Sequence, residues 1–334
     1  MRCINQKCIT CERYHSQASK YRSVSATRCA HFLKIASVGV PNTTLKNLVI
    51  KEPLDQEFFQ LLTKQNFPAL EHVDISWVKV NELSVNENIK SVILRSCNYE
   101  RVEPFSSNDF PFPMAKSLAL VSMITHFSPV CRLPKLEALE HLELRNSIVN
   151  DKLSSNKFPA LRSLVLEGNS VFRTVKITRL NKLHRFELHD TENLPQKTNW
   201  KGVNMVSLKN VRSIDVGKLA DGEVFPNLAA LYLDCIDNVN VKDLQPSSHI
   251  RKLSIKCGGT ILNLSNLEIR YRRLMDLSLD GKMDLADIPQ ISSLKRVKII
   301  PTPSKNVVRK WLKNCINLQS FNQKEVKFYN RWVS

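Results

Sequence analysis

The sequence is poor in glycine, with 8 residues among 334, and it contains no long apolar run. Glycine-rich loops that hold phosphate groups therefore have little to be built from. The longest apolar stretch, around 118–124, is far shorter than the roughly 20 residues that a membrane-spanning helix needs. The motifs G-x-S-x-G and H-E-x-x-H and the Walker phosphate loop are also missing. We therefore expect that the protein is not an enzyme and has no membrane partner.

The first residues lack the apolar core of a secretory signal peptide. The nine cysteines are an odd number, and their spacing pairs none of them. Both observations predict an intracellular protein with reduced thiols, in the nucleus or the cytoplasm. A mitochondrial presequence is disfavoured by Glu12 and by three cysteines among the first eleven residues.

Acidic residues are scarce at both ends of the chain. Residues 1–51 hold nine Lys/Arg and one acid, and residues 295–334 hold ten Lys/Arg and one acid. The ends therefore carry nearly all of the net charge of +18. Such charge influences partners and association rates and says little about the fold. We expect the basic ends to contact nucleic acid or an acidic protein.

Aliphatic residues, in contrast, are plentiful and regularly spaced, most clearly in the stretch 158–169, FPALRSLVLEGN. Leu161, Leu164 and Leu166 follow the spacing L-x-x-L-x-L, and Asn169 stands three residues after the last leucine. Leucines two residues apart in a strand point to the same face, and the residues between them point to the other. The pattern predicts a short strand with one buried face.

Twelve related copies are spread over the chain at intervals of 19–26 residues. They begin at Leu45, Leu70, Ile89, Ala115, Leu139, Leu183, Val203, Leu228, Ile250, Leu274, Leu294 and Leu318. Residues 40–320 thus resemble the leucine-rich repeat superfamily, in a diverged intracellular form similar to the repeat regions of fungal F-box proteins. The lead-in Phe-Pro-x-Leu at 67–70, 158–161 and 225–228 strengthens the resemblance. It implies an α/β solenoid, a horseshoe with a parallel concave sheet and about 13 irregular repeats.

Small or turn-favouring residues commonly stand one position before the Asn/Cys position of the repeat. They are Ser96, Asn146, Gly168, Asp190, Asn210, Cys235, Cys257 and Gly281, whereas only Cys97 and Asn169 occupy the expected position itself. We therefore predict that many strands end one residue early. Helices are predicted at 52–66 and at 304–315, where Ser304 can cap the first turn. Residues 98–135 are predicted to be the least regular part of the chain, with a protruding loop where Pro104, Pro111 and Pro113 cluster.

The predicted domains are a basic, cysteine-containing cap or tail at 1–40, the solenoid at 41–320 and a basic, aromatic cap at 321–334. Cys8, Cys11, His15 and Cys29 have the side-chain types of a zinc site, although their spacing matches no known signature. A plain cap, a targeting segment and a diverged F-box remnant around 30–36 are the alternatives. No other cofactor is expected.

The strand residues between the core leucines should form a concave surface that binds a macromolecule. The expected partner-binding residues are Glu143, Arg145, Glu187, His189, Tyr232, Asp234, Lys256 and Lys298. A basic patch is expected from Arg251, Lys252, Lys295, Arg296, Arg309 and Lys313. The sequence thus predicts a non-catalytic protein-interaction scaffold or adaptor subunit of a larger complex. The alternatives are a substrate-recognition subunit of a ubiquitin ligase, which the resemblance implies, and a direct nucleic-acid-binding protein.

Overall fold

The computed structural model describes most of the predicted repeats. The described residues are 23–26, 41–51, 60–77, 83, 85–96, 110–122, 133–147, 152–168, 176–190, 200–211, 225–244, 246–283, 289–300 and 303–325. The predicted zinc ligands Cys8, Cys11, His15 and Cys29 lie outside them. So do the F-box remnant, most of the helix at 52–66, much of the irregular stretch 98–135, and residues 326–334.

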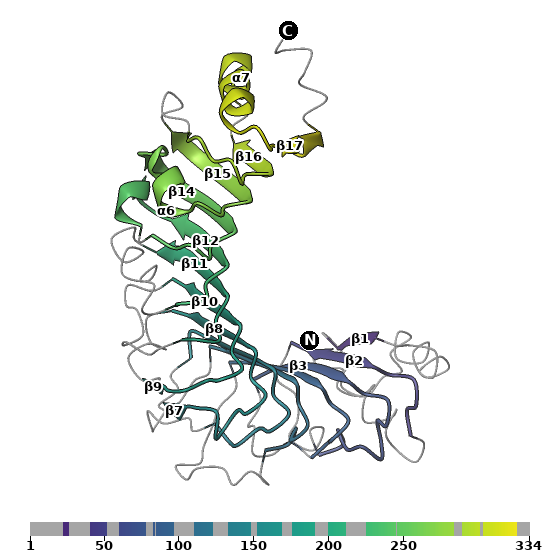
Figure 1. Cartoon of the computed structure of the whole chain (residues 1–334). Coiled ribbons are helices and arrows are strands. Elements are labelled where there is room, and N and C mark those ends of the chain that lie inside the picture. The colour runs from purple at the N-terminus through teal and green to yellow at the C-terminus, as the bar shows by residue number, and fades with distance from the viewer. Residues whose placement is uncertain are drawn as a thin grey trace, which may run out of the picture. The chain divides into compact units, whose positions relative to one another are not determined.

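The chain divides into two compact units, 1–162 with 173–182, and 163–172 with 183–334. In the first unit, the described residues form a parallel sheet whose strands follow one another in chain order (Figure 1). These strands are β1 (Ser23–Ala26), β2 (Asn47–Ile50), β3 (His72–Ser76), β4 (Ser91–Arg95), β5 (Ser117–Val121) and β6 (His141–Arg145). A separate parallel pair joins β7 (Lys152–Leu153) to β9 (Lys176–Ile177). The strand β1 lies within the predicted N-terminal cap.

The second unit continues in the same manner, with strands again in chain order (Figure 1). Its strands are β8 (Ser163–Glu167), β10 (Arg185–His189), β11 (Met205–Val211), β12 (Ala230–Cys235), β13 (Val239–Asn240), β14 (Lys252–Leu262), β15 (Asp276–Met283), β16 (Arg296–Ile300), β17 (Ser320–Phe321) and β18 (Lys324–Glu325). Helices are few in the described part of the chain: the 3-10 helix η3 (Val241–Asp243), α6 (Asn266–Arg270) and α7 (Lys305–Asn314). None of them is long and apolar enough to cross a membrane.

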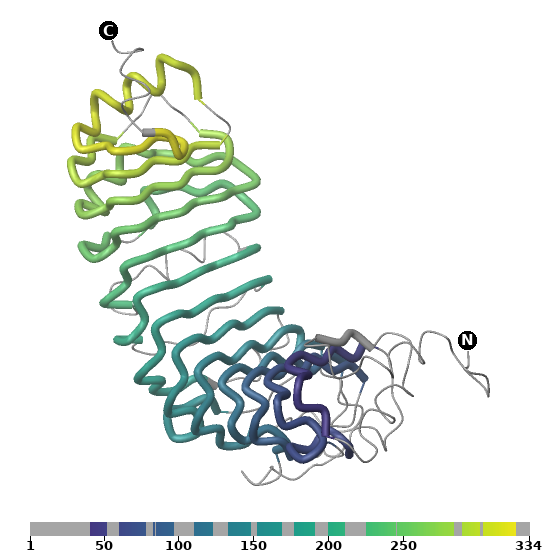
Figure 2. The backbone as a smooth tube through the Cα atoms, turned by 90° about the vertical axis from the view of Figure 1, so that its right-hand side faces the viewer, coloured from purple at the N-terminus to yellow at the C-terminus, as the bar shows by residue number. Residues whose placement is uncertain are grey.

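Each unit is a solenoid of stacked coils, in which every turn adds one strand beside the strand of the previous turn (Figure 2). The predicted parallel strands are confirmed, because a strand stands in each of the thirteen aliphatic repeats. The registers keep equivalent residues side by side, as in Leu166, Leu188 and Leu208. These three leucines are at most 1% exposed. Stacked aliphatic columns thus form the core.

Aromatic residues fill the core between successive turns. Phe186 lies 4.5 Å from Trp200 and 6.4 Å from Phe225, measured between ring centroids, and all three side chains are buried. Each large ring adds apolar area and specific packing to the column. This cluster binds three consecutive turns of the second unit together.

The lead-in Phe-Pro-x-Leu proves to be a general turn of this fold. In the turn at Phe67, the Leu70 N–H donates to the Phe67 carbonyl over 3.2 Å, and most other repeats have the equivalent bond. The first turn residue is buried even where it is no longer phenylalanine, as at Trp200 and Tyr271. The sequence pattern identified only three of these turns, because the buried residue varies in type while its position is kept.

Asparagines link neighbouring turns at a position that the repeat consensus does not predict. Asn88 donates to the Pro68 carbonyl over 2.8 Å, and Asn317 donates to the Ser292 carbonyl over 2.7 Å. Asn227 makes the same kind of bond in another turn. Each of them is the third residue of the lead-in turn. These three asparagine links precede their strands, whereas the consensus asparagine follows the strand.

The prediction that strands end early is confirmed at Ser96, Asn146, Gly168 and Asp190, which directly follow β4, β6, β8 and β10. All four have left-handed backbones, with φ between 46° and 89°. The Asp190 N–H donates to the Lys209 carbonyl of the next strand over 2.9 Å. The left-handed residue therefore turns the chain away from the strand, while its N–H still donates to the neighbouring strand.

The same prediction is wrong at Asn210, Cys235, Cys257 and Gly281, which lie inside β11, β12, β14 and β15. The additional strand β13 pairs with the far part of β14, and Thr260 of β14 pairs with Lys282 of β15. These pairings give the backbone further ladder partners, so the strands continue. Whether these strands end or continue therefore depends on pairing between residues more than twenty positions apart, which a local sequence pattern does not contain.

The helix predicted at 304–315 is confirmed as α7. Its apolar stripe buries Val308 and Trp311, while Arg309 and Lys313 are exposed. Ser304 stands directly before the helix, but its side chain makes no capping hydrogen bond, so that part of the prediction is wrong.

Candidate partner-binding face

We use the term outward strand face for the strand side chains that alternate with the core residues. In the second unit, this face forms three rows, because the strands from β8 to β16 pair in register. The middle row contains Val165, Glu187, Ser207, Tyr232, Ser254, Ser278 and Lys298. The row at the strand ends contains Glu167, His189, Lys209, Asp234, Lys256, Asp280 and Ile300. The row at the strand starts contains Ser163, Arg185, Met205, Ala230, Lys252, Asp276 and Arg296.

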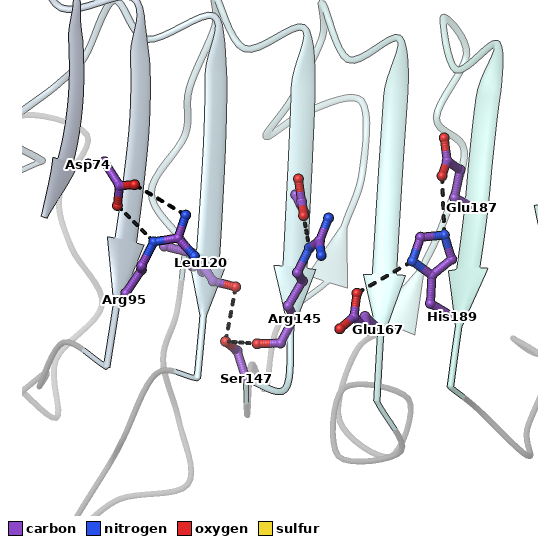
Figure 3. A network of polar contacts seen from close by, with 9 residues as sticks. Asp74, Arg95, Leu120, Arg145, Ser147, Glu167, Glu187 and His189 are labelled. Carbon is purple, nitrogen blue, oxygen red and sulfur yellow. Dashed lines mark hydrogen bonds and ion pairs between the residues drawn. The ribbon is translucent and has the colours of Figure 1, made fainter. Parts of the chain in front are cut away.

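A histidine on this face lies between two carboxylates (Figure 3). His189 Nδ1 lies 3.4 Å from Glu167 Oε2, and its Nε2 lies 3.2 Å from Glu187 Oε2. The three side chains are only 11–18% exposed. Carboxylates only accept hydrogen bonds, so the imidazole donates to both of them at once only when it is protonated.

The electrostatics of Glu187 reflect these contacts. The hydrogen bond from His189 lowers the pKa of Glu187, burial acts in the opposite direction, and Arg185 adds a second bond that lowers the pKa. Arg185 is itself 55% exposed, whereas Glu187 is 11% exposed. These contacts favour the ionised form of the Glu187 carboxylate, which accepts hydrogen bonds from both Arg185 and His189.

Tyr232 is the one aromatic residue in the three rows. It pairs in register with Ser207 on one side and with Ser254 on the other. Lys252 Nζ lies 5.2 Å from the centre of the tyrosine ring, within the range of a cation–π contact. The half-exposed ring thus projects from a flat strip of serines.

Two further predicted partner-binding residues, Asp234 and Lys256, form an ion pair between neighbouring strands, and Arg296 of the predicted basic patch forms another with Asp276. Lys256 Nζ lies 2.9 Å from Asp234 Oδ2, and this contact raises the pKa of Lys256. Arg296 donates to both oxygens of Asp276, over 2.5 and 2.6 Å. The bases are 60% and 66% exposed, and the acids 28% and 21%. In both pairs the cationic end faces outward.

The structure divides the predicted basic patch among different elements. Lys252 and Arg296 lie on the outward strand face, and Arg251 and Lys295 directly precede β14 and β16. Arg309 and Lys313 lie on the exposed side of α7. Lys298 is exposed on the strand face and has no ion-pair partner among the described residues.

The first unit also has ion pairs on its strands. The sequence analysis named the residues of the Glu143–Arg145 pair but not those of the Asp74–Arg95 pair. Arg145 donates to Glu143, two residues earlier on the same strand. Arg95 donates to both oxygens of Asp74 on the neighbouring strand, over 2.8 and 3.2 Å (Figure 3). The buried Ser147 hydroxyl lies 2.8 Å from the Arg145 carbonyl and 3.1 Å from the Leu120 carbonyl. The Asp74–Arg95 pair was missed because its partners are 21 residues apart, although the repeat spacing contained the signal.

Within the described ranges, no group of three or more His, Cys, Asp or Glu side chains is arranged to hold a metal ion. Neither a protein-family model nor a curated protein matches the chain.

Proposed function

We propose that this protein is a non-catalytic interaction scaffold or adaptor subunit that binds a protein partner on its outward strand faces. One observation carries the proposal: polar and charged side chains stand in registered rows above a closed aliphatic core. Rigid strands hold these side chains in place, so a partner binds without having to order them. Solenoids commonly use such extended surfaces for recognition.

We further propose that the solenoid is of the leucine-rich repeat class, with α/β character. The spacing L-x-x-L-x-L supports this assignment, since its leucines are the buried strand residues in turn after turn. The helix α7, which follows β16, is the kind of element that such repeats place after a strand.

A protein partner fits this surface better than a nucleic acid. The second unit's face carries six bases and five carboxylates. Arg185, Lys256 and Arg296 already have carboxylate partners. A phosphate strand would therefore lie against carboxylates as well as bases, and base stacking would rely on Tyr232 alone. A protein surface can match charges of both signs.

The proposal is tested by affinity purification of the full chain from cells, followed by cross-linking that maps contacts to residues. We expect cross-links to fall on the strand rows. Replacing Tyr232 by Ala together with Lys256 by Glu should reduce recovery of the cross-linked partner by at least about tenfold, as for interface hot spots.

The matched control is Lys242→Glu on η3, which makes the same charge reversal at an exposed residue away from the strand rows. It should leave recovery unchanged. Equal recovery with the face variant and the control, or cross-links that avoid both units' strand rows, would contradict the proposal.

A further inference from the structure

The outward strand face of the first unit has an apolar centre, unlike the polar rows of the second unit. Ile93 of β4 pairs in register with Ala119 of β5, and Val121 lies two residues further along β5. All three side chains are on the outward face, because they alternate with the buried residues of their strands. We call Ile93, Ala119 and Val121 the apolar centre.

The short side chain of Ala119 makes the outward strand face lower at this position than at the neighbouring positions. Ala119 is 8% exposed although it points outward, since Ile93 and Glu143 stand beside it on the two neighbouring strands. A single methyl group reaches less far from the sheet than either neighbour does. An incoming side chain can therefore approach the sheet more closely above Ala119 than beside it.

Two arginines border the apolar centre. Val121 pairs in register with Arg95 on one side and with Arg145 on the other. Each arginine is held by a carboxylate, Asp74 or Glu143, at the ends of the adjacent row (Figure 3). The arginines are 43% and 40% exposed, and the acids 20% and 29%. The guanidinium groups are thus the outermost charges of the border.

This pattern is that of a small protein-binding site. Interfaces between proteins have an apolar centre and a polar rim, and arginine is enriched at their energetically important positions. The strands and the carboxylates fix the arginines in advance, which reduces the entropy lost on binding.

Building on the proposed function, we infer that the apolar centre binds a protein segment that presents an aliphatic side chain flanked by carboxylates. The aliphatic side chain covers Ala119, and the carboxylates meet the exposed guanidinium groups of Arg95 and Arg145. A nucleic-acid strand fits less well, because its phosphates and sugars offer no aliphatic side chain to cover Ile93, Ala119 and Val121.

The test is selection of a displayed library of random peptides against the full-length chain, followed by affinity measurement with synthetic versions of the enriched peptides. The enriched peptides should share Leu, Ile, Val or Met with Asp or Glu within two positions. Val121→Asp should weaken their binding by at least about tenfold, because it places a charge in the apolar centre.

The matched control is Val85→Asp, which makes the same change at a valine of the first unit that is 50% exposed and lies outside the strands. Its affinity for the peptides should stay within about twofold of the original. Circular dichroism of both variants establishes that they are folded. A second variant, Arg95→Glu, should bind the acidic peptides more weakly. Binding to this variant should recover when lysines replace the acidic residues of the peptides.

The inference would be overturned by enriched peptides without the aliphatic and acidic pattern, or by equal losses of affinity in Val121→Asp and Val85→Asp. Stronger binding of a polyuridylate probe that is lost in Val121→Asp would assign the site to nucleic acid instead. If peptide binding is lost when Tyr232 is replaced but not in Val121→Asp, the inference is wrong and the proposed function is unaffected. The proposed function fails separately, through the cross-linking experiment.

Discussion

At the scale of single residues, the outward face depends on charges that hold one another in place. Glu187 is the clearest example, since it is buried and receives hydrogen bonds from both His189 and Arg185. Both bonds favour the ionised carboxylate, and together they lower its pKa. The folded protein therefore binds a proton at this site less readily than the unfolded chain does.

A group whose pKa is lowered by folding stabilises the fold above its ordinary pKa and loses that contribution as the pH falls through the lowered value. The ordinary value for Glu187 is 4.5. Glu187→Gln should therefore lower the melting temperature at about pH 7, and the difference from the original protein should vanish towards about pH 3. Thermal unfolding followed by circular dichroism over this pH range measures the difference.

The control is Glu268→Gln on the exposed surface of α6. Its effect on the melting temperature should be small at every pH. A Glu187→Gln effect that is independent of pH would show that the ionised carboxylate contributes nothing.

The core offers a second prediction at this scale. Phe186→Ala removes a ring that packs on Trp200 and Phe225, so unfolding should require about 3–5 kcal/mol less free energy. Val165→Ala, on the outward face of the neighbouring strand, should cost far less, because its side chain is only half-buried. Urea denaturation of both variants makes the comparison.

At the scale of elements, the ends of strands are controlled by backbone conformation. Asn146 follows β6 with φ of 46°, a region that β-branched residues enter only at a cost. Asn146→Val should therefore destabilise the protein by about 1–3 kcal/mol, while Asn146→Gly should be nearly neutral. Urea denaturation distinguishes the two outcomes.

Asn204 supplies the comparison, because it is exposed, precedes β11 and has no left-handed backbone. Asn204→Val should have a small effect. An equal loss of stability in Asn146→Val and Asn204→Val would mean that the turn at the end of β6 does not depend on its left-handed residue.

How much of the structure can be predicted from the sequence differs from element to element. The two-residue alternation places the buried leucines correctly, because burial of one strand face is a local property. The apolar centre was not predicted, since Ile93 lies in one repeat and Ala119 and Val121 lie in the next, within the irregular stretch 98–135. Only the registers of β4 and β5 bring them together. Likewise, the long β14 could not be predicted, because its length depends on pairing with β13 and β15.

At the scale of the whole molecule, net charge and binding faces are separate properties. The net charge of +18 comes almost entirely from the two ends of the chain. The rows of the second unit, in contrast, hold nearly equal numbers of acids and bases. Attraction to polyanions should therefore depend on the ends, and recognition of a specific partner on the strand faces.

This separation predicts that binding to polyuridylate is weak in specificity and strongly dependent on salt. Replacing Lys310 and Lys313 of α7 by Gln should reduce the slope of log affinity against log salt by about one for each phosphate contact removed. Val121→Asp should leave that slope unchanged. Fluorescence anisotropy at a series of salt concentrations provides both slopes, and an unchanged slope in the lysine variant would place the phosphate contacts elsewhere.

Among the described strands of the second unit, β17 is still parallel to β16, whereas β18 reverses direction. β17 and β18 pair antiparallel through Asn322 and Gln323, both of which have left-handed backbones. The Asn322 side chain accepts from the Ile299 N–H over 2.7 Å and donates to the Ile299 carbonyl over 3.2 Å. An open parallel edge would invite another molecule to dock its own strand and begin a fibre. A folded-back hairpin only two residues deep gives such growth no template to copy.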